Sequence, residues 1–246
     1  IRSGMLATAG VSLGMGSLLS TSSCVGANDR IVLALVGSGG RGLGTIINCC
    51  KINENVVIKT VCDVNRTKLA NAIDKVEKEL GYRPAKTENM QEIFDDKDVD
   101  AVWISTPEHW HTLATIWACQ AGKDVYVEKN PTINIWEGRK MVEAAKRYKR
   151  IVQVGFQNRS APYGFTARDY IASGKLGKIV TVKCYNMLGG AKFEEAPETA
   201  VPQWLDWDKW LGPAPMRPYS PTIVSENARG GWLNYWAYSG GGLSDD

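Results

Sequence analysis

Residues 31–42 read Ile-Val-Leu-Ala-Leu-Val-Gly-Ser-Gly-Gly-Arg-Gly, an apolar run that passes directly into a glycine-rich loop. The run is short, rich in β-branched residues and ends on glycine, which favours a buried parallel strand over a helix. Gly37, Gly39 and Gly42 fit the pattern G-x-G-x-x-G. In that pattern the first glycine allows a tight turn, the second lets backbone amides approach a pyrophosphate, and the third lets the next helix pack on the strand. The stretch therefore predicts a strand, a phosphate loop and a helix N-terminus that holds the anion.

A carboxylate follows at the distance that a dinucleotide site requires. A helical stretch at 43–51 leads to a second apolar run at 56–62, which ends on Asp63, 21 residues past Gly42. A carboxylate here accepts hydrogen bonds from a ribose 2′-hydroxyl and repels a 2′-phosphate, so NAD is expected to bind more tightly than NADP. Arg66 would partly neutralise such a phosphate, so the expected preference is modest. The alternative role for Asp63 is to cap a turn or a helix.

Strands and helices alternate along the next hundred residues. The helix predicted at 66–80 repeats its apolar residues every three or four positions, which places one apolar stripe against a sheet. Such alternation predicts parallel strands joined by right-handed crossovers, the arrangement of a doubly wound Rossmann domain. The further expected elements are a loop at 81–86, helices at 90–94, 112–121 and 136–148, and strands at 101–105, 124–127 and 151–155.

Beyond residue 158 the pattern changes. A helix is expected at 163–173 and an alternating, half-buried strand at 179–185. From Glu194 onward the chain is rich in proline and tryptophan and is expected to be mostly loop. The tryptophans of this region are expected mainly to fill a core, and stacking on a sugar ring is the alternative.

Composition excludes several classes of protein and identifies no partner. The 246 residues are 44% apolar and 22% charged, which is ordinary for a globular chain of one or two domains. A formal charge of +3, without a basic face, gives no sign of nucleic-acid binding. The six cysteines include no C-x-x-C pair, so we interpret them as small buried side chains and expect no metal site.

The first thirty residues have the composition of an export signal. Arg2 precedes an uncharged run of small and apolar residues from Met5 to Leu19, and the segment ends in Ser-Thr-Ser-Ser-Cys at 20–24. We expect residues 1–30 to be a cleaved or tethering segment, with an ordinary first helix as the alternative. Cys24 is a candidate lipid-anchor cysteine, although Thr21 stands where a leucine is usual. The expected location is therefore exported, either periplasmic or lipid-anchored, and otherwise cytoplasmic.

Three later motifs, taken in order with the phosphate loop, carry a resemblance to a known family. They are Thr106-Pro107, Glu128-Lys129 and the run Asp-Trp-Asp-Lys-Trp-Leu-Gly-Pro at 206–213. Together they resemble the glucose–fructose oxidoreductase / inositol dehydrogenase / MocA family over residues 31–246, most closely its exported members from Bacteroidetes-type bacteria. The resemblance implies an NAD-binding Rossmann domain over 31–158 and, over 159–246, the beginning of an α+β domain with a mostly antiparallel sheet for substrate and oligomerisation. It also implies hydride transfer between a nicotinamide cofactor and a sugar or polyol, and homo-oligomers of the full-length protein.

The resemblance assigns roles residue by residue. Lys129 and Asp245 are the predicted catalytic residues, and with Arg159 they are the predicted substrate contacts. Lys129 is expected to take the hydroxyl proton as the hydride leaves, with Glu128 pointing elsewhere. The predicted cofactor contacts are Gly37, Ser38, Gly39, Gly40, Arg41, Gly42, Asp63, Arg66, Ser105, Thr106, Pro107, His111, Glu128 and Lys129.

The sequence departs from the family pattern at two places. Asn130 stands where the family's Glu-Lys-Pro motif has proline, and Pro131 follows one place late. The segment at 240–245 matches the start of G-G-x-L-x-D, but the histidine expected about three residues further on is absent. The first residue is Ile1, not methionine, so we interpret the chain as part of a longer precursor that is truncated at its C-terminus.

Four functions remain open from the sequence. The leading hypothesis is an NAD-dependent sugar or polyol dehydrogenase. The first alternative is a glycosidase that holds NAD tightly and oxidises its sugar transiently, and the second is a dinucleotide-binding module without catalysis. A methyltransferase on a Rossmann fold is a weaker rival, because Lys129 would have no evident role in it.

Overall fold

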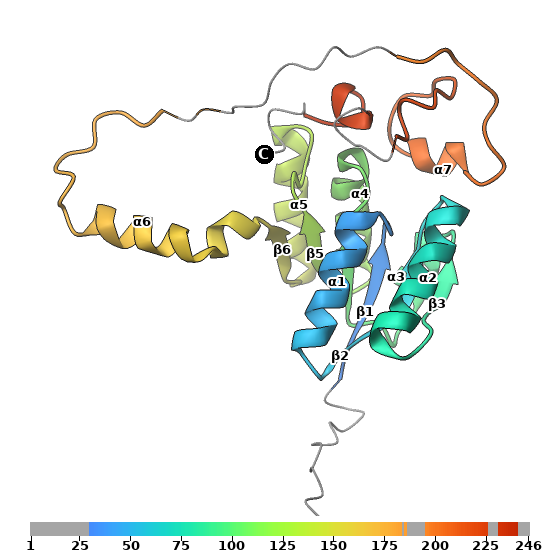
Figure 1. Cartoon of the computed structure of the whole chain (residues 1–246), viewed down its shortest axis with the longest axis horizontal. Helices are drawn as coiled ribbons and strands as arrows, with labels where there is room; N and C mark the ends of the chain where they lie inside the picture. Colours follow the sequence, from blue (N-terminus) through green and yellow to red (C-terminus); the bar gives the residue numbers. More distant parts are fainter. Residues whose placement is uncertain (1–29, 184, 186–194, 226–230, 241–246) are drawn as a thin grey trace, which may run out of the picture.

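The computed structural model describes residues 30–183, 185, 195–225 and 231–240. Its centre is a six-stranded parallel sheet with the order β3-β2-β1-β4-β5-β6 (Figure 1). The chain order reverses between β1 and β4, so the carboxyl ends of these two strands meet where open α/β sheets bind ligands. The strands are β1 (Ile31–Val36), β2 (Val56–Cys62), β3 (Ala85–Thr87), β4 (Ala101–Ile104), β5 (Asp124–Glu128) and β6 (Val152–Gly155).

Helices cover both faces of the sheet. On one face α1 (Gly40–Ile52) and α2 (Arg66–Leu80) bury an apolar stripe against β1 and β2, and on the other α3 (Met90–Asp95), α4 (Glu108–Gln120) and α5 (Ile135–Tyr148) pack on β4 and β5. Asparagine side chains cap the N-termini of α2, α3 and α5, which satisfies backbone amides that have no partner within the helix. The predicted doubly wound Rossmann fold is confirmed.

The structure changes several expected element boundaries in this domain. The loop predicted at 81–86 ends early, because residues 85–87 form the edge strand β3, whose three residues are too few to show an alternating pattern. Helix α4 begins at Glu108, four residues before the predicted start, because Pro107 occupies the N-cap position, where its fixed φ is tolerated. On α5, Met141 and Ala144 are buried, whereas Val142 is 47% exposed.

After β6 the chain leaves the body as an extended arm (Figure 1). A 3-10 turn, η2 (Gln157–Ser160), leads into α6 (Pro162–Ala172), none of whose residues is buried. Residues 179–183, part of the predicted strand, are exposed and pair with no strand in the described part of the chain, so that prediction is wrong for them. A strand is stable only when a neighbour accepts and donates its backbone hydrogen bonds, and the described residues supply none here.

The chain then returns to the body as what we call the C-terminal lobe, residues 195–225 and 231–240, which is mostly loop as predicted. It contains α7 (Trp207–Leu211) and η4 (Trp232–Asn234). Core packing is confirmed for Trp207 and Trp210, which are buried and stacked with ring centroids 4.9 Å apart. Trp236, by contrast, is 81% exposed.

Several sequence predictions concern residues for which the structure gives no placement. The signal segment up to residue 29, with Cys24, lies outside the described residues, and so does Asp245. Within the described ranges, no helix is long and apolar enough to cross a membrane. Within the same ranges no three acidic, histidine or cysteine side chains gather as a metal site. The described cysteines form no disulfide. Cys62 and Cys119 are buried as predicted, whereas Cys49 and Cys50 are only half-buried.

Candidate cofactor and active site

The phosphate loop lies against the end of β4. Gly37 has φ +88°, and a Cβ there would lie 2.6 Å from the carbonyl carbon of Ser105, so neither the turn nor the space admits a side chain. A Cβ on Gly42 would overlap the Ser105 side chain, because the first turn of α1 packs directly on this strand end. A Cβ on Gly39 or Gly40, in contrast, would meet no atom within 4 Å. The first and third glycines therefore close the strand–helix junction, and the loop between them faces open space.

Asp63 is held in a defined orientation at the end of β2. Its Oδ2 accepts hydrogen bonds from the backbone amide and the hydroxyl of Ser38, both at 2.8 Å, and its Oδ1 accepts one from the amide of Asn65 at 2.8 Å. The turn-capping role considered as the alternative for Asp63 is therefore present, and the carboxylate also joins β2 to the phosphate loop. Ser38 is buried, so its contribution is to fix Asp63.

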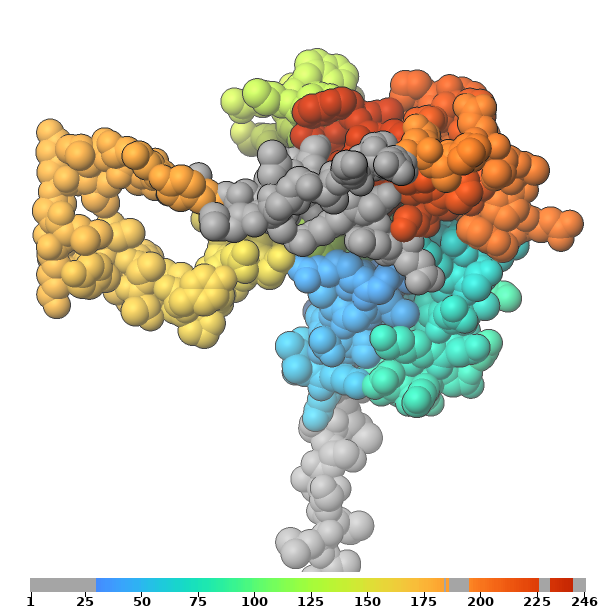
Figure 2. Space-filling view, turned by 45° about the horizontal axis from the view of Figure 1, so that its top comes forward, coloured from blue at the N-terminus to red at the C-terminus, as the bar shows by residue number. Residues whose placement is uncertain are grey.

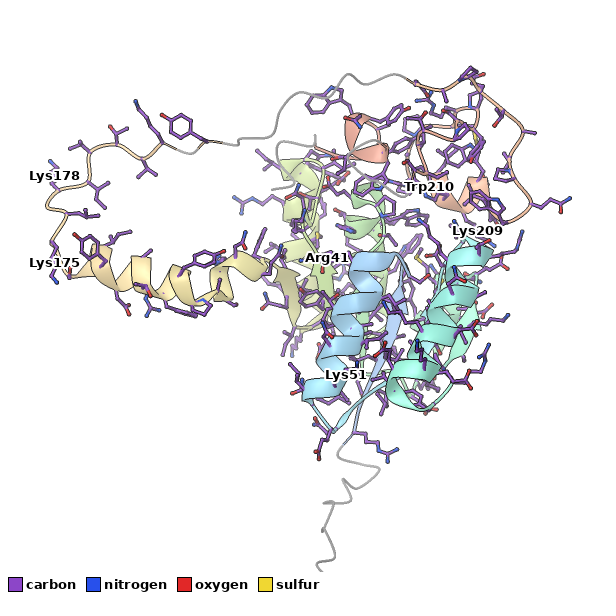
Figure 3. All side chains as sticks on the ribbon, viewed as in Figure 1. Arg41, Lys51, Lys175, Lys178, Lys209 and Trp210 are labelled. Carbon is purple, nitrogen blue, oxygen red and sulfur yellow. The ribbon has the colours of Figure 1, made fainter. Side chains whose placement is uncertain are left out.

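The loop, Asp63 and the end of β4 line one cleft together with the C-terminal lobe. The lobe contributes apolar and aromatic residues and Lys209 to this cleft. Figure 3 shows Lys209 and Trp210 above the end of α2. Sequence reasoning missed Lys68 and the lobe residues of this cleft, although the motif at 206–213 contained Lys209 and Trp210. The residues that line the cleft include Gly37, Gly39, Gly40, Arg41, Gly42, Asp63, Lys68, Ser105, Thr106, Pro107, Leu205, Lys209, Trp210, Val224, Ser225 and Trp232.

Arg66 does not line this cleft. Its guanidinium forms an ion pair with Glu88 at 3.0 Å and donates to the carbonyl of Gln203, and its amide donates to the carbonyl of Trp204 at 2.8 Å. The residue predicted to soften the repulsion of a 2′-phosphate is thus engaged with the lobe and with Glu88. Lys68, two residues further along α2, is the cation of this helix that lines the cleft.

Glu128 ends β5 and is directed at the phosphate loop. It is 4% exposed, its Oε1 lies 3.5 Å from Nε of Arg41, and neither carboxylate oxygen has a hydrogen-bond partner among the described residues. This contact agrees with the expectation that Glu128 points away from Lys129. Lys129 follows it, partly exposed, and the Lys129–Asn130 peptide bond is cis.

His111 lies behind the cleft. It is buried, with Nδ1 2.6 Å from the carbonyl oxygen of Asn130 and Nε2 2.8 Å from that of Thr106. The imidazole therefore joins the loop after β4 to the loop that carries Lys129. The resemblance implied a position beside the nicotinamide, and the structure gives His111 this bridging position between the two loops.

The structure separates the remaining predicted substrate contact from the cleft. Arg159 is exposed in η2, at the root of the arm, and is not among the residues that line the cleft. The structure thus brings the phosphate loop, Asp63 and Ser105–Pro107 together in one cleft. Glu128, Lys129 and His111 are not among the residues that line it, and Arg159 lies apart. Whether each predicted residue contacts a ligand stays a prediction.

Two family models match the chain. Residues 31–156 match the Gfo/Idh/MocA model described as "Oxidoreductase family, NAD-binding Rossmann fold". Residues 169–246 match the model described as "Oxidoreductase family, C-terminal alpha/beta domain". The second match begins within α6, so it takes in part of the arm as well as the lobe.

The chain is also similar to individual proteins. It is 33% identical over 123 residues to scyllo-inositol 2-dehydrogenase (NAD(+)) of Bacillus subtilis (strain 168), which is 50% of this chain and 36% of the relative. It is 27% identical over 126 residues to glycosyl hydrolase family 109 protein 1 of Shewanella sp. (strain ANA-3), which is 50% of this chain and 27% of the relative. The solved structure of myo-inositol 2-dehydrogenase from Lactobacillus plantarum superposes with a TM-score of 0.53 at 25% identity, covering 61% of this chain and 43% of that one. The chain therefore spans less than half the length of these relatives.

Proposed function

The chain belongs to the Gfo/Idh/MocA oxidoreductase family, and from this premise we propose that it transfers a hydride between a nicotinamide cofactor and a hydroxyl group of a sugar or polyol. The observation that carries the proposal is the cleft in which the phosphate loop, Asp63 and the C-terminal lobe meet. The similarity to inositol dehydrogenases supports the substrate class.

The residues of the cleft fit a dinucleotide. The N-terminus of α1 has no side-chain cap and faces open space above Gly39 and Gly40, so its amides are available to a pyrophosphate. Arg41, Lys68 and Lys209 line the same cleft, Arg41 beside Glu128 at 3.5 Å and Lys209 paired with Asp206 at 3.0 Å. When bound, the nicotinamide ring supplies the hydride chemistry, and the protein's part is to orient it and to handle the proton.

The geometry favours NAD over NADP. Asp63 is held by Ser38 where it can accept from a ribose hydroxyl, and Arg66, which would offset a 2′-phosphate, is paired with Glu88. We expect at least tenfold tighter binding of NAD, about 1.4 kcal/mol. Dissociation constants of both cofactors check this, and Asp63→Asn, which removes the charge but keeps the shape, should narrow the difference. Tighter NADP binding by the unchanged protein would contradict the proposal.

Lys129 is the proposed proton-transfer group. An alcohol oxidation needs a base within hydrogen-bond reach of the reacting hydroxyl, and Lys129 directly follows β5 at the carboxyl edge of the sheet, where open α/β sheets bind ligands. Lys129→Met should lower turnover by about a hundredfold or more with NAD affinity nearly kept. The matched control is Lys175→Met, because Lys175 lies at the far end of the arm (Figure 3).

The assay follows NADH formation with inositols, xylose and other polyols as probes. Activity of Lys129→Met within a few-fold of the unchanged protein would mean that another group takes the proton. Stoichiometric NAD binding without turnover on the whole panel would favour the binding module without catalysis.

The second candidate function is an NAD-dependent glycosidase, favoured by the similarity to the family 109 glycosyl hydrolase of Shewanella. In such an enzyme the same hydride site oxidises the sugar and then reduces it again. Release of a chromogenic aglycone without net NADH would distinguish it from a dehydrogenase.

We further propose that residues up to about Asn28 are an export segment of the kind found in Bacteroidetes-type relatives, with Cys24 as the candidate lipid anchor. Their uncharged, glycine-containing composition after Arg2 supports this. Deleting them should leave the melting temperature and the NAD affinity unchanged. A large loss of either would show that the segment is structural.

A further inference from the structure

Glu108 is a buried acid to which the sequence assigned no role. It is the first residue of α4, follows Thr106-Pro107, and is 0% exposed. Its Oε1 accepts a hydrogen bond from Nδ2 of Asn130 at 3.2 Å, and its Oε2 accepts one from the backbone amide of Gly240 at 3.1 Å. One carboxylate therefore contacts the loop after β5 and the end of the described C-terminal lobe.

The neighbouring residues of α4 reinforce both contacts. His111 contacts the backbone carbonyl of Asn130 at 2.6 Å, so Asn130 is held through its side chain and its main chain. On the lobe side, the amide of His109 donates to the carbonyl of Tyr238 at 3.2 Å, two residues before Gly240. The first turn of α4 thus joins two segments that the sheet alone would not place together.

The two N–H donors that face position 108 explain why a carboxylate suits this position. A carboxylate is acceptor-only and can take an N–H on each oxygen, whereas a glutamine amide offers one acceptor and one donor. The isosteric amide would therefore face one of the two N–H groups with a donor of its own. Glu108 satisfies two buried donors, and in the orientation that Asn130 has in the structure, with Nδ2 toward residue 108, at least one of those bonds is lost with glutamine.

We propose that Glu108 is a positioning residue that sets the Lys129 loop, through Asn130, relative to the C-terminal lobe, through Gly240. Lys129 immediately precedes Asn130, so a shift of the amide held by Glu108 is a shift of Lys129. The inference rests on the proposed proton-transfer role of Lys129 for its functional consequence. The juxtaposition of Asn130, Glu108 and Gly240 is independent of that role.

The test reverses the direction of one hydrogen bond. In Glu108→Gln, the backbone amide of Gly240 should exchange its hydrogen at least tenfold faster. The NMR signal of the Lys129 side chain should also shift; this signal is observed in the full chain after its lysines are labelled by reductive methylation with ¹³C-formaldehyde. The Lys129→Arg variant assigns that signal.

The double variant Glu108→Gln/Asn130→Asp is designed to restore both hydrogen bonds. The carboxylate of Asn130→Asp accepts a hydrogen bond from the amide group introduced by Glu108→Gln, whose oxygen then accepts from the backbone amide of Gly240. The pair should restore both readouts toward the unchanged protein, a recovery that independent effects cannot produce.

Two further variants make the result specific. Asn130→Ala should move the Lys129 signal and leave Gly240 exchange within about twofold, because Glu108 still accepts from Gly240. Asp124→Asn is the control: this carboxylate accepts from the backbone amide of Ile151 at 2.9 Å at the start of β5, the end of the strand opposite Lys129, and its loss should leave both readouts unchanged. Where the unchanged protein oxidises myo-inositol, Glu108→Gln should lower kcat at least tenfold with the dissociation constant for NAD within twofold.

Unchanged readouts in Glu108→Gln, or a double variant no better than the single one, would overturn the proposal. If Glu108→Gln does not fold, recovery of folding in the double variant supports it and failure to recover counts against it. Absence of NAD binding by the unchanged protein would contradict the proposed function and leave the reversal test intact.

Discussion

The arm and the C-terminal lobe both follow the Rossmann body and both carry large apolar side chains, but only the lobe buries them. In the arm Tyr163 is 64% exposed and Leu176 53%. In the lobe Leu211 is 1% exposed and Ile223 and Tyr238 are fully buried. Figure 2 shows the arm projecting from the body with an opening between α6 and the segment that follows it, while the lobe lies directly on the molecule. Apolar composition is therefore a poor guide to burial in this half of the chain.

The lobe is buried because the body offers it matching hydrogen-bond partners. An antiparallel bridge joins Leu205 to Asn65, the amide of Arg66 donates to the carbonyl of Trp204, and the amide of Asp206 donates to the carbonyl of Val64. These contacts satisfy backbone groups that would otherwise be buried without partners, so apolar side chains can pack around them. Residues 179–183 of the arm have no described backbone partner, and their side chains remain in solvent.

The comparison predicts that replacing leucine by alanine lowers the free energy of unfolding much more in the lobe than in the arm. Leu211→Ala should lower the free energy of unfolding by about 2–5 kcal/mol, because it leaves a cavity in the core of the lobe. Leu176→Ala, in the exposed arm, should change it by about 0.5 kcal/mol or less. Denaturant titration of both variants measures the difference. Equal effects would show that the arm is packed in solution.

Acid should weaken the docking of the lobe through His109. Burial lowers the pKa of His109 from its ordinary value of 6.5 to about 4, although its hydrogen bond to the carbonyl of Trp210 opposes this. Nδ1 of this ring has no partner among the described residues, so the imidazolium would bury an unsatisfied N–H. Because the unfolded chain takes up the proton first, stability should fall as the pH drops from about 6.5 to about 4, by about 3 kcal/mol in all.

Unfolding measured across that pH range checks this loss, with His109→Gln as the comparison variant. Glutamine cannot take up a proton, so this part of the pH dependence should disappear even if the variant is less stable at pH 7. An unchanged slope between pH 6.5 and 4 in His109→Gln would assign the acid sensitivity to other groups.

A further comparison of the lobe with the arm uses one glycine from each, and its expected effect is the smallest of the three predicted changes in stability. Gly212 in the lobe and Gly174 in the arm both have positive φ, 48° and 73°, so alanine strains the backbone at both. At Gly212 a Cβ would also overlap the Trp110 ring, whereas at Gly174 it would meet nothing within 4 Å. Gly212→Ala should therefore cost about 1–3 kcal/mol more than Gly174→Ala in thermal unfolding. A smaller cost at Gly212 would mean that Trp110 moves aside easily.

The Rossmann half could be predicted from sequence because its signals are local. The apolar run before Gly37, the glycine spacing and the position of Asp63 specify a strand, a turn and a carboxylate within one continuous stretch. Periodicity likewise located α2 within residues 66–80, since a stripe of side chains against a sheet repeats along the chain itself. The edge strand β3 was missed because three residues carry no period.

The tertiary structure decided which distant groups meet. Sequence position suggested Arg66 as a cofactor contact, but in the folded chain Arg66 is paired with Glu88. The fold also directs Glu128 toward Arg41. Glu108 belongs to no sequence motif with an assigned role, yet in the folded chain its carboxylate contacts both Asn130 and Gly240. A side chain at the end of a strand or helix has several partners within reach. Which of them it takes depends on where segments far away in the chain are packed, and no local pattern in the sequence records that choice.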